Sequence, residues 1–90
     1  MPVKMEVFSG NPPCPGCIEI VRLCEAVAGE YAGEIDFIKY IGEEGMEKFQ
    51  EYSMFCVPAV VINRYIKIEG IVPSRQTLLN ALREGGLWIK

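Results

Sequence analysis

Four cysteines are the residues of this chain best suited to chemistry, and two of them are close neighbours. Cys14 and Cys17 flank Pro15 and Gly16, a spacing that lets two sulfurs meet across one helical turn. A thiolate can attack a disulfide, and a second thiol can then close an intramolecular disulfide. Because the chain contains no histidine, it can build neither a Cys-His nucleophile nor a mixed Cys/His zinc site. Thiol–disulfide exchange is therefore the first chemistry to consider.

Metal binding is the competing chemistry. Cys14, Cys17, Cys24 and Cys56 supply the four thiols that tetrahedral zinc or an iron–sulfur cluster needs. However, there is no second Cys-x-x-Cys pair, and Cys24 would lie about 10 Å further along a helix than Cys17. We therefore expect no metal site in one chain, although a cluster shared between two subunits through Cys14 stays open.

Composition narrows the function classes further. A chain of 90 residues, half of them apolar, predicts one globular domain over residues 1–90. The net charge is -3 and the cations are scattered, which argues against a nucleic-acid partner. The longest apolar run, 54–62, is too short to cross a bilayer, and no signal-peptide core precedes the first charges. We expect a cytoplasmic protein without a membrane partner, in which cysteines are redox-active or buried rather than structural disulfides.

Hydrophobic periodicity predicts alternating strands and helices. Apolar and β-branched runs predict strands at 3–9, 35–41, 59–62 and 65–69. Pro15 suits the first position of a helix, and Gly29 and Gly33 are expected to end it. Between them, apolar residues recur at helical spacing and form one stripe: Cys17, Ile20, Val21, Cys24, Val27 and Ala28. Glu43 and Glu44 are expected as solvated charges in the first turn of a short helix, where the helix dipole favours them, with Met46 and Phe49 on the buried face of that helix. Ser74 can cap a last helix that buries Leu78, Ala81 and Leu82.

The resulting order, β-α-β-α-β-β-α, predicts an α/β fold. The first two strands must be parallel and joined by a right-handed crossover, whereas a turn at Asn63-Arg64 makes the last two antiparallel. A four-stranded mixed sheet in the order 2-1-3-4 follows, with three helices on two faces and a C-terminal tail at 85–90. Ligands and reacting groups collect beyond the carboxyl ends of parallel strands, which is where Cys14 and Cys17 fall.

The Cys14-Pro15-Gly16-Cys17 motif at a strand-to-helix junction resembles the active site of thioredoxins and glutaredoxins. Val57-Pro58 before the third strand resembles the cis-proline loop of that superfamily, and Gly70 resembles the glycine between its last strand and last helix. In size and layout the chain is most similar to the short, glutaredoxin-sized thioredoxin-like proteins of archaea and bacteria.

This resemblance implies roles for individual residues. Cys14 would be the exposed nucleophile and Cys17 the buried resolving thiol. Pro58 would be cis, and the backbone of Val57 would pair with an extended substrate segment. Pro15, Gly16 and Gly70 would line the substrate site. The redox-active disulfide Cys14–Cys17 would take the place of a cofactor.

The sequence departs from the superfamily pattern at several positions. The stretch 70–73 carries no carboxylate where glutaredoxins have one that holds glutathione. Phe8 and Pro13 stand where larger thioredoxins carry an acidic residue and a tryptophan, and the one tryptophan is Trp88. Lys39 occupies a position where thioredoxins often have lysine, but its usual carboxylate partner is missing.

The other two cysteines have different expected roles. Cys24 shares the buried stripe with Cys17, so we expect it to pack in the core. Cys56 lies two residues before Pro58, so it is either a packing residue or an auxiliary thiol that traps or tunes Cys14.

The functional prediction is a monomeric thiol–disulfide oxidoreductase that reduces protein disulfides. A thioredoxin-reductase-type or ferredoxin-linked enzyme would recharge it. Two alternatives remain: a glutaredoxin-like electron donor to one enzyme, and a module that binds metal or an iron–sulfur cluster through its cysteines.

Overall fold

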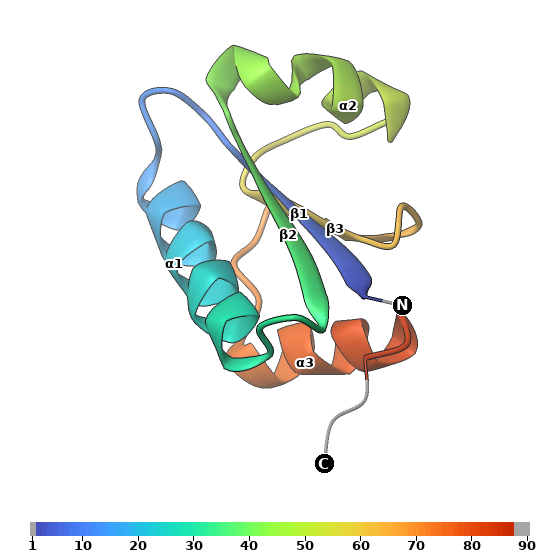
Figure 1. Ribbon diagram of the computed structural model, residues 1–90. Coiled ribbons are helices and arrows are strands. Elements are labelled where there is room, and N and C mark those ends of the chain that lie inside the picture. The colour runs from blue at the N-terminus through green and yellow to red at the C-terminus, as the bar shows by residue number, and fades with distance from the viewer. Residues whose placement is uncertain (1, 88–90) are drawn as a thin grey trace.

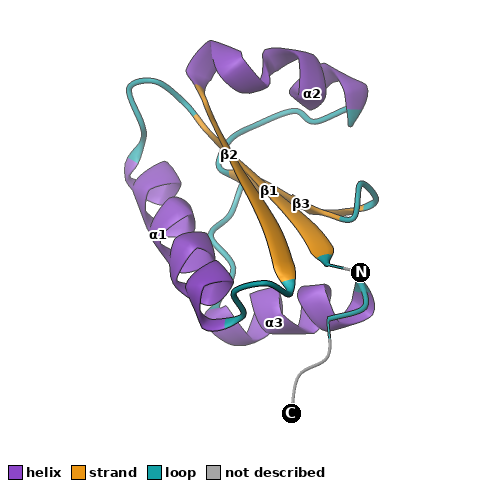
Figure 2. Cartoon of the chain, viewed as in Figure 1, coloured by secondary structure: helices purple, strands orange, loops and turns teal. Residues whose placement is uncertain are grey.

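A four-stranded sheet with helices on both faces makes up the computed structural model, which describes residues 2–87 (Figures 1 and 2). Trp88 and the rest of the chain end lie outside the described residues. The strands are β1 (Val3–Ser9), β2 (Ile35–Ile41), β3 (Ala59–Ile62) and β4 (Ile66–Glu69). The helices are α1 (Pro15–Glu30), the 3₁₀ helix η1 (Gly42–Gly45), α2 (Met46–Glu51) and α3 (Arg75–Glu84).

The predicted sheet topology is confirmed. The strand order is β2-β1-β3-β4, and β1 pairs in parallel with β2 and antiparallel with β3. The parallel register runs from Val3 opposite Ile35 to Ser9 opposite Ile41. Because β1 lies in the interior of the sheet, its carboxyl end, from which the chain leads to Cys14, is held on both sides.

Alternate side chains of β1 point to opposite faces of the sheet, and each face packs against its own hydrophobic core. Val3, Met5 and Val7 face one core, which also receives apolar side chains of α1 and α3. Phe8 faces a smaller core with Tyr52, Met54, Ala59 and Val61. Accordingly, α1 and α3 cover one face of the sheet and α2 covers the other (Figure 1). The predicted burial of Leu78, Ala81 and Leu82 on α3 is confirmed.

The predicted buried face of the second helix is partly wrong. Met46 is 52% exposed, and only Phe49 packs against the smaller core. The reason is η1, which the sequence pattern did not predict. Gly45 at its end is buried, and a Cβ there would lie 2.6 Å from the Cβ of Tyr40. The backbone of Gly45 therefore packs directly against the sheet, and the side chain of Met46 is turned outward.

Two smaller corrections concern the C-terminal third. β4 begins at Ile66 rather than at Tyr65, because Ile62 pairs with Ile66 and the turn therefore takes in Tyr65 as well as Asn63 and Arg64, whose φ values are 50° and 70°. Leu87, which we expected in a tail, is 4% exposed and belongs to the larger core. Its N–H donates to the carbonyl of Leu82 at 2.9 Å, which holds the chain against α3.

Candidate active site

Cys14 stands at the N-terminus of α1, directly after the loop that leaves β1. Its backbone is extended (φ -75°, ψ 166°), and its sulfur accepts a hydrogen bond from the N–H of Cys17 at 3.1 Å. Pro15 occupies the first helical turn, where its missing N–H costs nothing. Because the helix N-terminus carries partial positive charge, it favours an anion at this sulfur. Cys14 is exposed, so the sulfur can meet an incoming disulfide.

Cys17 is fully buried beneath Cys14, and the two sulfurs are 2.8 Å apart. Burial raises the pKa of the Cys17 thiol, but hydrogen bonds from Cys14, from the backbone of Gly10 and from Ser9 outweigh burial. The pKa of Cys17 is therefore held below its ordinary value.

The loop before β3 borders the cysteine pair on one side. The Val57–Pro58 peptide bond is cis. A Cβ on Gly16 would lie 3.4 Å from the Pro58 ring, so the motif and this loop are in close contact. Val57 is 38% exposed, and its backbone groups make no hydrogen bond with another residue in the range 2–87. An extended peptide can therefore pair with them without displacing a partner.

Gly70 joins the same loop cluster from the end of β4. Its N–H donates to the carbonyl of Pro58 at 2.8 Å. Its φ is +78°, and a Cβ there would lie 3.0 Å from the sulfur of Cys56. Gly70 thus leaves room for the Cys56 side chain, which is exposed and lies two residues before Pro58. The structure brings together the motif, the cis-proline loop and Gly70.

Similarity to known proteins agrees with this arrangement. The family model described as a thioredoxin domain matches residues 3–83. A thioredoxin of Methanocaldococcus jannaschii is 34% identical over 84 residues, covering 91% of this chain and 94% of its own. A probable thioredoxin of Methanothermobacter thermautotrophicus is 33% identical, with coverage of 93% and 96%. The chain belongs to the thioredoxin family.

Solved structures show that the thioredoxin fold extends over the chain. A thioredoxin-like protein from Clostridium perfringens superposes with a TM-score of 0.77 at 20% identity, covering 96% of this chain and 72% of that one. The germline-specific thioredoxin Deadhead of Drosophila melanogaster gives 0.74 at 17% identity, covering 92% and 80%. No helix of this thioredoxin-family chain within residues 2–87 is both long and apolar enough to span a bilayer.

Cys24 of this thioredoxin-family chain lies in the larger core, as expected, with no exposed surface. Burial raises the pKa of its thiol to about 12, and the nearby charge of Glu25 acts in the same direction. Among the described residues, no three Cys, Asp or Glu side chains gather closely enough to hold one metal ion. All four cysteines are free thiols.

Lys39 has a carboxylate partner that sequence reasoning missed. Its ammonium lies 3.5 Å from a carboxylate oxygen of Glu25 on α1, and both side chains are nearly half exposed. Both residues, together with Cys17, line a hollow of about 230 Å³ between α1 and β2. The sequence placed Lys39 on the correct strand, but it gave no means of aligning Glu25 with it across the two elements.

Glu6 is a second polar feature that the sequence analysis missed. It is fully buried on β1, where its carboxylate accepts hydrogen bonds from the hydroxyls of Tyr52 at 2.7 Å and Tyr40 at 3.1 Å. Burial and this carboxylate raise the pKa of both tyrosines. An acidic residue inside an apolar strand was the available signal. It lies on the α2 side of the sheet and anchors β2 and the end of α2 to β1.

Proposed function

We propose that this protein is a thiol–disulfide oxidoreductase that reduces protein disulfides through Cys14 and Cys17. The observation that carries the proposal is the pair of sulfurs 2.8 Å apart, one exposed and one buried, at the N-terminus of α1. Such a pair can hold a substrate covalently and then release it. The names of the family relatives support the same class of reaction.

The first step forms a mixed disulfide. The Cys14 thiolate attacks one sulfur of the substrate disulfide, and the other substrate sulfur leaves as a thiolate and takes up a proton. The N–H of Cys17 and the helix dipole favour the attacking anion. The unpaired backbone groups of Val57 are suited to bind the substrate segment as an added strand during this step.

The second step releases the reduced substrate. Cys17, deprotonated, attacks the sulfur of Cys14, the mixed disulfide breaks, and the second substrate sulfur leaves as a thiolate that is then protonated. Cys14 has no thiol proton to donate once it is in the mixed disulfide, so the groups that favour the Cys17 anion in this step are the backbone of Gly10 and the side chain of Ser9. A disulfide bond of about 2.05 Å requires only a small approach of two sulfurs that already lie 2.8 Å apart. Overall, two electrons and two protons pass to the substrate, and the protein retains the Cys14–Cys17 disulfide.

A reductase must return two electrons for another turnover. We propose a thioredoxin-reductase-type or ferredoxin-linked enzyme for this role, with the protein acting as a cytoplasmic monomer. No residue of the described chain adds support for the glutathione-linked alternative. The carboxylate nearest Gly70 in the sequence, that of Glu69, accepts the backbone N–H of Phe55 at 3.1 Å. Cys56, exposed beside Gly70, remains our candidate for an auxiliary thiol.

The two steps can be separated experimentally. Cys14→Ser is expected to lower the reduction of a protein disulfide substrate to the rate of dithiothreitol alone, because the exposed thiol at the helix N-terminus is lost and Cys17 is buried. Cys17→Ser is expected to retain the first attack and accumulate a mixed disulfide, which intact-protein mass spectrometry detects. Cys24→Ser is the control, since Cys24 is buried away from the pair. Wild-type turnover by the Cys14→Ser variant would overturn the proposal.

A further inference from the structure

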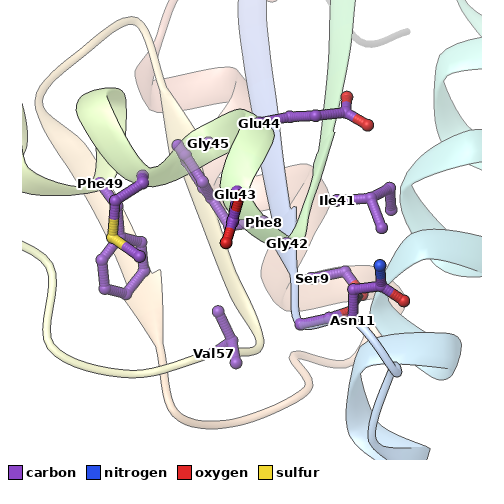
Figure 3. A pocket seen from close by; sticks show the side chains of 12 residues that line it. Phe8, Ser9, Asn11, Ile41, Gly42, Glu43, Glu44, Gly45, Phe49 and Val57 are labelled. Carbon is purple, nitrogen blue, oxygen red and sulfur yellow. Dashed lines mark hydrogen bonds between the residues drawn. The ribbon is translucent and has the colours of Figure 1, made fainter.

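A cavity of about 570 Å³ lies on the α2 side of the sheet, beside Val57 and the start of the loop that leads to Cys14. Its walls come from the end of β1, the start of the following loop, the turn η1 with the first residues of α2, and Val57 (Figure 3). Two of these walls belong to the site already described. Val57 precedes the cis proline, and Ser9 lines both this cavity and the hollow that Cys17 also lines. A side chain in this cavity would therefore belong to a molecule whose neighbouring atoms reach the cysteines.

The cavity combines apolar walls with negative charge. Phe8, Phe49, Met46 and Val57 provide the apolar surface, of which Met46 and Val57 are the most exposed. The carboxylate of Glu43 points into the hollow, toward Val57 (Figure 3). Glu43 forms no ion pair with any residue between 2 and 87. No lysine, arginine or histidine lines the cavity, so nothing in its walls neutralises this charge.

Close backbone contacts fix Glu43 over the cavity. A Cβ on Gly42 would lie 2.8 Å from the Cβ of Asn11, and one on Gly45 would lie 2.9 Å from the ring of Phe8. These two glycines let η1 press against the loop that leads to Cys14 and against the sheet. Glu43 lies between them in the turn, so the contacts on either side set the position of its backbone.

We propose that this cavity selects disulfide substrates that carry a lysine or arginine beside the attacked cysteine. The inference rests on the proposed function and names the class of substrate for it. A lysine or arginine stem can cover the apolar walls while its charged end meets Glu43. An acidic side chain would meet uncompensated negative charge, and the same repulsion disfavours small thiols that carry carboxylates.

The expected size of the preference for lysine or arginine depends on how exposed Glu43 is to solvent. Partly screened ion pairs contribute up to about 1 kcal/mol, which corresponds to about a two- to fivefold difference in rate constant. Screening by salt weakens such pairs, so the preference should shrink when ionic strength rises from about 0.02 M to about 0.5 M. A preference that came only from apolar contact would persist in salt.

The test uses a set of synthetic peptides that contain one disulfide and differ at a single residue. Lysine, leucine and glutamate are placed in turn at each of the three positions on either side of the attacked cysteine, and kcat/KM for reduction is measured. Lysine should be favoured over leucine, and leucine over glutamate, at one of these positions. Diaminopropionate at that position should lose the advantage of lysine, because its short stem cannot carry the ammonium to Glu43.

Two variants connect the preference to Glu43. Glu43→Gln should remove the preference for lysine, and Glu43→Lys should reverse it toward glutamate. Glu47→Gln is the matched control, because it makes the same change in net charge on α2 at an exposed residue that does not line the cavity. It should leave the ratio of lysine to leucine rates as in the wild type.

Each outcome decides one question. Equal rates for lysine, leucine and glutamate at every position, with all peptides reduced, would overturn the substrate preference and leave the proposed function standing. A preference that survives Glu43→Gln would overturn the role of Glu43. Failure of the wild type to reduce any peptide disulfide would overturn the proposed function and this inference together.

Discussion

Cys17 and Cys24 lie on the same helix, seven residues apart, and neither has any exposed surface. The pKa of Cys17 is nevertheless lowered, whereas that of Cys24 is raised to about 12. Cys17 stands in the first turn of α1, beside the sulfur of Cys14, the backbone of Gly10 and the side chain of Ser9. Cys24 stands among apolar side chains of the larger core. The two ends of one buried stripe therefore have opposite chemistry.

The difference shows that hydrogen-bond donors, and not burial alone, determine which cysteine can react. Backbone N–H groups in the middle of a helix already donate to carbonyls one turn back, so none is free to stabilise a thiolate at Cys24. The first turn has free N–H groups, and the chain folds a strand end against it. Burial without donors raises the pKa of the Cys24 thiol, whereas the donors lower that of Cys17, which suits Cys17 to the resolving role that we propose.

The largest expected effect is in the titration of the two thiols. With a pKa of about 12, only about one Cys24 side chain in a thousand is ionised at pH 9, whereas Cys17 ionises below its ordinary value. Cysteine ¹³Cβ shifts in reduced, labelled protein should report titration of Cys17 and a constant signal from Cys24 up to pH 10. Cys24→Ala assigns the constant signal. Titration of Cys24 below pH 9.5 in folded protein would contradict the comparison.

A smaller difference is expected in stability when either thiol becomes a hydroxyl. Cys24→Ser places a polar group in the apolar core and should lower the free energy of unfolding by about 1–3 kcal/mol. Cys17→Ser should cost less than about 1 kcal/mol, because Gly10 and Ser9 already offer hydrogen bonds there. Urea unfolding of the reduced proteins measures both values. Equal losses would mean that the two surroundings are not as different as their contacts indicate.

The smallest expected effect tests one donor. Ser9→Ala removes the side chain that hydrogen-bonds to Cys17, so the pKa of Cys17 should rise, by less than about one unit. The second step should slow at neutral pH and recover as the pH is raised, because the thiolate fraction is then restored. Decay of the mixed disulfide followed by rapid quenching measures this. A rate that falls equally at every pH would indicate a structural effect in place of an electrostatic one.

Local patterns were sufficient for most of the fold. Pro15 and Ser74 mark helix starts, and the helical stripes and β-branched runs place the elements within one or two residues. These signals come from residues close together in the sequence. Over such short stretches, spacing alone decides which side chains share one face of a helix or strand. Met46 shows the limit of the method: its spacing suited a buried face, but the preceding 3₁₀ turn brought Gly45 to the sheet first.

The surroundings of the cysteines were less accessible to sequence reasoning. The Lys39–Glu25 ion pair joins a strand to a helix. The Glu6 carboxylate accepts hydrogen bonds from two tyrosines that lie 34 and 46 positions further along the chain. Glu43 was taken as a solvated first-turn charge, whereas the structure directs it into the cavity beside Val57. Each of these pairings depends on how separate elements are packed, which no local spacing specifies.

The sequence by itself determined the element order, the sheet topology and the junction that holds Cys14 and Cys17, because helix and strand periods and turn residues act over a few neighbouring positions. Only the tertiary structure decided the donors around Cys17, the apolar surroundings of Cys24 and the acidic cavity. Those depend on contacts between segments far apart in the chain, and such contacts set the local polarity that lowers the pKa of one buried thiol and raises that of the other.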